Sequence, residues 1–411
     1  MTRTIGRSRA HDDVWVSRRR HPTAKPAPPS PRRSKTFVGL LGVITTLNLL
    51  GMVMVLSASS VSALDTYGSA WTIATRQLGW LAGGVAICVV LARVDYHRWR
   101  QGAVPIVATS VLLLGMVLVP GVGRNINGAS RWLGYGPFSL QPSELAKLAV
   151  LVFVADLLAR RAAWMHDLRL TLMPVTIVFS GIAGLVMLQP NLGTTLVLGA
   201  IVLTVLFVAG TPVLPLGAIG ALGGLAATIL ALIEPYRRAR ILAFLDPWKD
   251  YEDSGYQTIQ SLVGIASGGI TGIGLGQSRA KWGFLPYAHT DFIFAIIGEE
   301  LGLVGALAVV GLFVALCLLG ARAAQLAPDR FGMLLAVGVT AWFGVQAFIN
   351  IGAVIGILPI TGVPLPFVSY GGSSLVFSMA AAGLLLNVAR QARLPEAGSR
   401  RHRRVAASTR R

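Results

Sequence analysis

The sequence has little cysteine and little charge. Its two cysteines, Cys88 and Cys317, lie far apart in apolar runs, so neither a disulfide framework nor a paired-cysteine zinc site can be drawn. Asp, Glu, Lys and Arg make up only 13% of the chain, about half their share in an average soluble protein. Hydrophobic residues make up 54% of the 411 residues. This composition excludes an ordinary soluble globular domain.

The excess of basic over acidic residues is confined to the two ends. The formal net charge is +19, of which residues 1–35 contribute +8 and residues 390–411 contribute +7. The 354 residues between them are close to neutral at +4. Because the charge belongs to two appendages, we expect no nucleic-acid partner. The tails, 1–36 and 390–411, lack the apolar content to fold, and we predict disordered cytoplasmic segments that lie against anionic lipid.

The body between the tails repeatedly supplies the roughly 20 apolar residues that cross the hydrocarbon core of a membrane. The runs are too long and too uniformly apolar for barrel strands, and only a helix satisfies its own backbone in lipid. We therefore predict an all-α polytopic integral membrane domain over 37–389, with about ten transmembrane helices. The predicted spans are 37–57, 77–92, 103–120, 143–159, 170–188, 194–210, 212–233, 291–320, 331–354 and 369–389.

The basic residues of the short loops set the orientation of these spans. With ten spans and both termini in the cytoplasm, the outer loops 189–193 and 355–368 are uncharged. The inner loops then contain Arg93, Arg98, Arg100, Arg160, Arg161, Arg169, Arg322 and Arg330. The exception is the large outer loop 234–290, between helices 7 and 8, which carries several basic residues. Long loops escape the charge rule, and we interpret this one as a structured working surface.

Ionisable groups inside the spans are costly, so each one is a candidate site residue. Glu144 and Lys147 are three residues apart in the fourth span, which puts them on one helical face as a potential ion pair. Arg131 and Trp132 come shortly before them in the chain. The alternative is a structural ion pair that only tethers a loop.

Asp291 opens the eighth span at the boundary between water and lipid, beside Phe292 and Phe294. Apolar walls disfavour the charged carboxylate, so we expect a raised pKa, which suits a general base. The alternative is a helix N-cap or a first-turn aspartate that stabilises the helix dipole. His289 is the one histidine that the predicted topology places outside. It is a second candidate, with a structural histidine as its alternative.

Two segments are rich in glycine. The GxGxG run 272–276 follows no predicted strand, which favours a flexible or closely packed turn over a nucleotide site. The segment 361–374 combines two prolines with two glycines. Irregular backbone is tolerated in a membrane only where protein buries it or a cavity needs it, so this segment is either a tight helix junction or part of a pocket. Its candidate substrate-binding residues are Ser369, Tyr370, Gly371 and Gly372.

Several separated motifs together resemble those of a known family, in the family's order. The matching runs are Asn127–Leu133, Gln141–Lys147, Gln189–Thr194, Gly255–Gln257 with Gln260 and Ser261, His289–Glu300 and Pro364–Ser374. The chain resembles the SEDS proteins, the group that contains RodA and FtsW, over about residues 37–390. The resemblance implies a ten-helix membrane protein with a large outer loop between helices 7 and 8, in agreement with the topology predicted from the residues.

The resemblance also implies an activity. SEDS proteins are peptidoglycan glycosyltransferases that join lipid II units into glycan strands on the outer face of the bacterial cytoplasmic membrane. By motif position, Asp291 corresponds to the family's essential outer-loop aspartate, and Arg131 and Trp132 to its arginine–tryptophan pair. Glu144 and Lys147 fall in the family's serine-glutamate-to-lysine stretch.

The sequence departs from the family pattern at two positions. Tyr287 stands where many members have a glutamate, which puts a catalytic carboxylate at that position in doubt and leaves Asp291 less assisted. Asn191 replaces the aspartate that usually follows the Gln-Pro pair.

The implied reaction needs a base for a sugar hydroxyl and stabilisation of a departing lipid diphosphate. We expect Asp291 to take the proton as the hydroxyl attacks the anomeric carbon with inversion. The candidate cations for the diphosphate are Arg131, Lys147, Arg279 and Lys281, with arginine better suited to bidentate phosphate contacts. A divalent cation, Mg or Mn, could share this task, but we predict no metal ligand because the sequence has no DxD or histidine-rich cluster.

Other functions compete with polymerisation. A flippase or transporter of a lipid-linked sugar also uses broken helices and intramembrane charge, and a non-catalytic scaffold for a transpeptidase is a further alternative.

Within the family, the run from Asn350 towards Ser374 favours the division type, FtsW, over the elongation type, RodA. The resemblance implies undecaprenyl-diphosphate-linked glycan as ligand, with a class B penicillin-binding protein and divisome proteins as partners at the septum.

Overall fold

The structure is a computed structural model, which describes residues 35–126, 129–135, 138–251 and 255–392. Nearly all of the two basic tails, and the Asn127-Gly128 pair of the first motif, lie outside the described residues. The predictions of disorder and lipid contact for the tails therefore stay predictions.

Ten long helices in the described part coincide with the ten predicted spans. They are α1 (Lys35–Tyr67), α2 (Thr72–Arg93), α3 (Arg98–Leu118), α4 (Pro142–Arg160), α5 (Leu172–Leu188), α6 (Leu192–Ala209), α7 (Val213–Ile233), α10 (Ile293–Gln325), α11 (Arg330–Val354) and α12 (Gly372–Gln391). Eight are long and apolar enough to cross a membrane. α5 is shorter, at 17 residues, and α4 carries four charged side chains. A multi-pass membrane protein is confirmed, while the count of ten spans stays a prediction.

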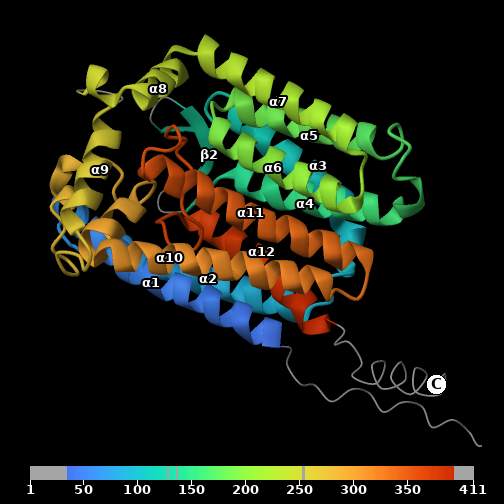
Figure 1. Cartoon of the computed structure of the whole chain (residues 1–411), viewed down its shortest axis with the longest axis horizontal. Coiled ribbons are helices and arrows are strands. Elements are labelled where there is room, and N and C mark those ends of the chain that lie inside the picture. The colour runs from blue at the N-terminus through green and yellow to red at the C-terminus, as the bar shows by residue number, and fades with distance from the viewer. Residues whose placement is uncertain (1–34, 127–128, 136–137, 252–254, 393–411) are drawn as a thin grey trace, which may run out of the picture. The chain divides into compact units, whose positions relative to one another are not determined.

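The long helices run side by side, with the shorter helices α8 and α9 and the strand β2 gathered at one end of the bundle (Figure 1). α2 packs against α12, α10 against α11, and α3 against α4. Most of α12 is buried, whereas α7 lies at the edge and exposes large apolar side chains such as Leu214, which is 86% exposed. An apolar outer face of this kind is typical of helices that contact lipid.

The segment predicted as the outer loop 234–290 contains several helical elements. They are α8 (Pro235–Leu245), the 3₁₀ turn η2 (Pro247–Asp250), α9 (Tyr256–Gly268) and the π-helical turn η3 (Ala280–Phe284). α8 combines arginines with exposed Leu242 and Leu245, a composition typical of a helix at a membrane interface. The segment is thus structured, and α8 brings arginines to the end of the bundle where the site lies.

A small antiparallel sheet, which the all-α prediction did not include, precedes α4. Its strands are β1 (Arg124–Ile126), β2 (Ala129–Tyr135) and β3 (Phe138–Leu140), in the order β1-β2-β3. Trp132 on β2 pairs with Arg124, and Leu133 pairs with Leu140. β1 and β3 have three residues each, and the seven residues of β2, Ala-Ser-Arg-Trp-Leu-Gly-Tyr, do not alternate between apolar and polar, so no strand pattern is visible in the sequence. The sheet places Arg131 at the same end of the bundle as α8.

The helix of the eighth predicted span, α10, begins at Ile293 and is broken at Gly302. Gly302 has φ 67° and ψ −166°, a conformation that essentially only glycine adopts. A Cβ at Gly302 would lie 2.3 Å from the backbone nitrogen of Gly272. The backbone N–H groups of Leu303 and Val304 donate to the carbonyls of Gly269 and Ile270, at 2.9 and 3.1 Å. The 272–276 run is therefore a closely packed turn, as predicted.

Candidate functional site

Asp291 lies in a turn immediately before α10. Tyr287 has a positive φ of 58°, and its carbonyl accepts hydrogen bonds from the N–H groups of Thr290 and Phe292 at 3.0 and 3.4 Å. The N-cap of α10 is Phe292, and no side chain caps the helix there. The alternative that Asp291 serves as an N-cap is therefore wrong. The turn leaves its carboxylate available for chemistry.

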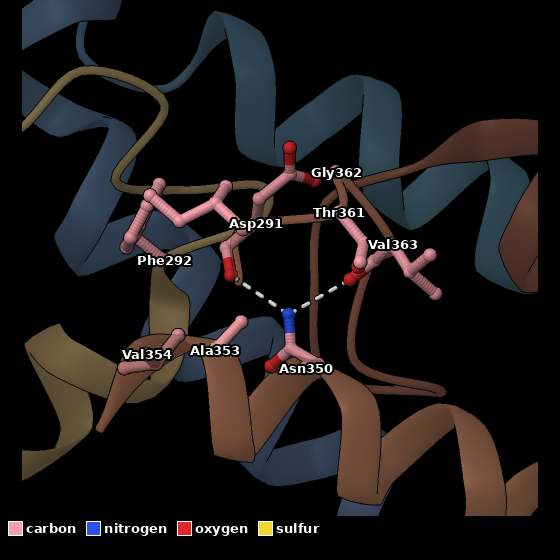
Figure 2. Close-up of a pocket in the computed structure, with 9 residues that line it drawn as sticks. Asp291, Phe292, Asn350, Ala353, Val354, Thr361, Gly362 and Val363 are labelled. Atoms are coloured by element: carbon pink, nitrogen blue, oxygen red, sulfur yellow. Dashed lines mark hydrogen bonds between the residues drawn. The ribbon is translucent and has the colours of Figure 1, made fainter. Parts of the chain in front are cut away.

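A small pocket surrounds Asp291. Its lining residues are Asp291, Phe292, Asn350, Ala353, Val354, Ile360, Thr361, Gly362 and Val363. They come from the turn before α10, the end of α11 and the connection from α11 to α12. Figure 2 shows the Asp291 carboxylate on the side of Gly362, away from the amide of Asn350. A Cβ at Gly362 would lie 3.6 Å from Asp291 Oδ2, so bare backbone borders the carboxylate.

The connection between α11 and α12, predicted as either a helix junction or part of a pocket, is both. It packs against α6, because a Cβ at Gly193 would lie 2.8 Å from the carbonyl oxygen of Thr361. Asn191 caps α6, with Oδ1 accepting from the N–H of Thr194 at 3.3 Å. An asparagine performs this capping as well as the aspartate usual in the motif. The α5–α6 turn thus forms one wall behind the pocket.

Burial sets the electrostatics of Asp291. Burial raises the pKa of Asp291 to about 6, and the positive charges of Arg240 and Arg131 oppose that rise. Among the described residues, no group donates a hydrogen bond to the carboxylate. A carboxylate that is ionised at neutral pH, unpaired and of raised basicity is suited to accept a proton from a hydroxyl. The raised pKa agrees with the expectation from the sequence.

Arg131 is held by the turn between α5 and α6. Its Nε donates to the carbonyl of Gln189 at 2.9 Å, and its terminal nitrogen donates to the carbonyl of Pro190. Trp132 follows Arg131 on β2, and neighbouring residues of a strand point to opposite faces. The positive charge of Arg131 favours the ionised form of Asp291. The substrate-binding role of Trp132 stays a prediction.

Arg240 is a candidate site residue that was not singled out from the sequence. It lies on α8, and its Nη1 donates to the carbonyl of Ile360, a pocket residue, at 3.4 Å. The basic run at 237–240 marks this part of the chain in the sequence. Which arginine of the run faces the pocket depends on the rotation of α8, which the run alone does not fix.

Glu144 and Lys147 form the predicted ion pair, with Lys147 Nζ 2.8 Å from Glu144 Oε1. Both side chains are buried, and Lys147 also donates to Gln346 Oε1 at 2.9 Å and lies 4.7 Å from the ring centre of Trp342. These contacts satisfy the ammonium group inside the bundle. The geometry favours the structural interpretation, and substrate binding by this pair stays a prediction.

Lys281 belongs to a second buried cluster, where α1 meets α10. Its Nζ donates to the carbonyl of Gly276 at 2.6 Å and lies 3.4 Å from Glu300 Oε1. Ser57 Oγ donates to the same carboxylate at 2.6 Å. Arg279 is exposed, and its backbone N–H donates to Glu299 Oε1 at 2.9 Å. Neither Lys281 nor Arg279 lines the pocket among the described residues.

His289 contacts the start of α12 through Tyr370. The two rings meet edge to face with centres 5.6 Å apart, and the Tyr370 N–H donates to the His289 carbonyl at 2.9 Å. Burial lowers the pKa of His289, so the ring is neutral at pH 7. These contacts support the structural alternative for His289.

Three other predicted substrate-binding residues, Ser369, Gly371 and Gly372, contact α2. The Gln77 amide donates to the Ser369 carbonyl and accepts from the Gly371 N–H, both at 3.4 Å. Gly372 packs against Trp80. Substrate contacts by Ser369, Tyr370, Gly371 and Gly372 stay predictions.

The described residues contain no group of three or more His, Cys, Asp or Glu side chains placed to hold a metal ion. The donor set around Asp291 consists of one carboxylate with two arginine charges acting on it, an arrangement that favours an anion over a cation. These residues do not form a metal site from protein side chains alone, and a role for Mg or Mn shared with the substrate diphosphate stays a prediction.

Comparisons with known proteins give the chain its relatives. The model of the FtsW/RodA/SpoVE family, described as cell cycle proteins, matches residues 39–394. A probable peptidoglycan glycosyltransferase FtsW from Geobacter metallireducens is 41% identical over 85% of this chain and 93% of its own length. Stage V sporulation protein E from Bacillus subtilis is 43% identical over 87% of this chain and 99% of its own length.

A solved structure shares the fold. It belongs to a peptidoglycan synthase complex that was studied for the coordination of polymerization and crosslinking. The match has a TM-score of 0.71 at 34% sequence identity, and covers 86% of this chain and 97% of the other.

Arg240→Ala is expected to raise the pKa of Asp291 above about 6, because the guanidinium charge favours the ionised carboxylate. A carbodiimide labels the protonated carboxyl, so labelling of the Asp291 peptide, measured by mass spectrometry, should persist to a higher pH in the variant. Arg238→Ala is the matched control, since Arg238 is exposed on the same helix. Identical labelling profiles for the two variants would contradict the placement of Arg240.

Proposed function

The chain belongs to the FtsW/RodA/SpoVE family, and we propose that it is a peptidoglycan glycosyltransferase that polymerises lipid II on the outer face of the cytoplasmic membrane. The observation that carries the proposal is the carboxylate of Asp291, which receives no hydrogen bond from the described residues. Its pKa is raised to about 6, and two arginine charges act on it. A base beside cations is what hydroxyl attack on a sugar diphosphate requires.

In the proposed reaction, the acceptor sugar's hydroxyl oxygen forms a bond to the anomeric carbon of the donor. The bond from that carbon to the diphosphate oxygen breaks, and undecaprenyl diphosphate departs with the electron pair. Asp291 takes the hydroxyl proton and later releases it to water. Attack opposite to the leaving group inverts the anomeric centre, as in an inverting glycosidase.

The departing diphosphate needs positive charge close to Asp291. Lys147 and Lys281 are paired with buried glutamates, so moving either to the substrate would leave a buried carboxylate unpaired at a cost of several kcal/mol. Arg131 and Arg240 act on Asp291 itself and offer the bidentate geometry that phosphate favours. We assign the diphosphate to these two arginines. No step is routed through a metal ion.

The size of the pocket limits what it can hold. It holds about 10 Å³, room for about one water molecule and far less than the roughly 300–1,000 Å³ of typical ligand pockets. A sugar therefore does not fit inside it, and the reacting hydroxyl approaches the partly exposed side chain of Asp291 from outside. Both substrates then lie outside the pocket, with the polyprenyl chains in the bilayer against apolar faces of the bundle.

The sidedness of the site and its partners are part of the proposal. With both termini cytoplasmic, the pocket faces outward, where the wall is assembled. The likeness to a chain of a complex that coordinates polymerization and crosslinking supports a class B penicillin-binding protein as the crosslinking partner, with divisome proteins around it. A flippase or transporter would also span the membrane with helices, but it has no need of a base at the outer rim.

Asp291→Asn is expected to abolish polymer formation from purified lipid II by the reconstituted protein, with a loss of at least about 100-fold, because a positioned base contributes that much or more. The variant should remain folded, since burial disfavours the charge that it removes. Asp246→Asn is the control, because Asp246 lies in the same outer segment and pairs with exposed Lys249. Undiminished polymer from Asp291→Asn would refute the catalytic role. Lipid flipping by the wild type without strand synthesis would instead support a transporter.

We propose that the chain works at the division septum, because the similar Geobacter protein carries the name FtsW. A fluorescent fusion to the full chain is expected to concentrate at midcell as the cell constricts. A signal that follows the side wall instead would favour an elongation role like that of RodA.

A further inference from the structure

Asn350 on α11 joins the main chain at Asp291 to the opposite wall of the pocket. Its Nδ2 donates to the carbonyl of Asp291 and to the carbonyl of Val363, each at 2.8 Å (Figure 2). Both partners are carbonyl oxygens, which only accept, so the NH₂ end of the amide must face them. One side chain therefore fixes the spacing between the turn that carries the carboxylate and the segment that borders it.

The oxygen of the Asn350 amide makes no comparable hydrogen bonds. Asn350 is 2% exposed, and its Oδ1 is buried without a hydrogen-bond partner among the described residues. Burying an unsatisfied acceptor costs about 1–3 kcal/mol. A half-satisfied buried amide is a poor choice for stability alone.

Asn387 on α12 shows what a fully satisfied amide looks like in the same bundle. It is 0% exposed, and its Nδ2 also donates to two backbone carbonyls, those of Leu91, at 2.6 Å, and of Val94. Unlike Asn350, its Oδ1 accepts a hydrogen bond, from Gln391 at 2.7 Å. The two asparagines make the same kind of contact, but only Asn350 does so beside the pocket.

Gln346, one helical turn before Asn350, extends the same arrangement. Its Nε2 donates to the carbonyl of Pro364 at 2.8 Å, so the two amides hold consecutive carbonyls, those of Val363 and Pro364. Gln346 Oε1 accepts from Lys147 at 2.9 Å and from Trp342 at 2.7 Å. The buried ion pair of α4 therefore anchors Gln346, and α11 presents both amides to the wall of the pocket.

We propose that Asn350 is a positioning residue for the glycosyl transfer, one that sets the place of the Asp291 carboxylate by holding its main chain against Val363. The inference rests on the proposed function for its effect on turnover. The carboxylate lies one short side chain from the restrained carbonyl, so a shift of the turn moves it directly. A displacement of about 1 Å at a catalytic group can cost on the order of 100-fold in rate.

The restraint also governs the surroundings of the carboxylate. The charged groups that act on Asp291 are Arg131 from β2 and Arg240 from α8, and the nearby His289 is neutral because burial lowers its pKa. Releasing the turn should let water reach the carboxylate, which weakens the effect of burial. The pKa of Asp291 should then fall towards its ordinary value.

The test compares Asn350→Ala with Asn387→Ala in the full-length chain, reconstituted with purified lipid II. For Asn350→Ala we expect kcat to fall about 10- to 100-fold with little change in KM, and carbodiimide labelling of Asp291 to end at a lower pH than in the wild type. For Asn387→Ala we expect wild-type kcat and labelling, but a larger drop in melting temperature, because a fully satisfied amide is lost. Asn350→Ser, whose hydroxyl can donate to one of the two carbonyls, should lie between the wild type and Asn350→Ala.

Wild-type kcat and labelling in Asn350→Ala would overturn the positioning role and leave the proposed function standing. If the wild type made no polymer, the proposed function would fail, and the labelling of Asp291 would still decide the inference. A shift in Asn350→Ala that is absent in Asn387→Ala supports the restraint, and equal profiles refute it. If Asn350→Ala did not fold, Asn350→Ser would decide by the same two measurements.

Discussion

A carboxylate at the end of an apolar helix bundle is costly to ionise, and the arrangement of the site follows from that cost. Burial raises the pKa of Asp291 to about 6, while Arg131 and Arg240 lower it, so the group is ionised at neutral pH yet more basic than an exposed carboxylate. The turn before α10, the small sheet and α8 each bring one of these three charges to the same end of the bundle. These three elements, which lie outside the ten long helices, thus position the charged groups of the site.

Two buried lysine–glutamate pairs elsewhere in the membrane domain stabilise its packing. Lys147 is neutralised by Glu144 and Lys281 by Glu300, and in a low dielectric such pairs are rigid because breaking either leaves an uncompensated charge. The first pair anchors Gln346, which holds the wall of the pocket. Glu144, Lys147 and Lys281, which the sequence offers as substrate-binding candidates, are thus absent from the lining of the described pocket, and the first pair supports that pocket through Gln346.

The sequence predicts the helices better than it predicts the site. Long apolar runs locate the spans, because the thickness of the bilayer fixes their length, and the apolar neighbours of Asp291 predict its raised pKa. The break of α10 at Gly302 cannot be seen in the sequence, because its cause is contact with Gly272, thirty residues away. The seven residues of β2, the strand that carries Arg131, do not alternate between apolar and polar, and the side that Arg240 faces depends on the rotation of α8. Local patterns reveal local structure, such as the Glu144–Lys147 pair on one helical face, but the pairing of Lys281 with Glu300 and the reach of Asn350 depend on packing between separate elements.

The account depends on Asp291 acting as a base in its ionised form. The most direct measurement is the pH dependence of kcat/KM for polymerisation of purified lipid II by the wild-type protein, which reports the ionisations of the free enzyme. The account predicts a rate that falls with decreasing pH, with a midpoint near the pKa of about 6. A rate that stays constant down to about pH 5, more than one unit above the ordinary aspartate pKa of about 3.9, would contradict it.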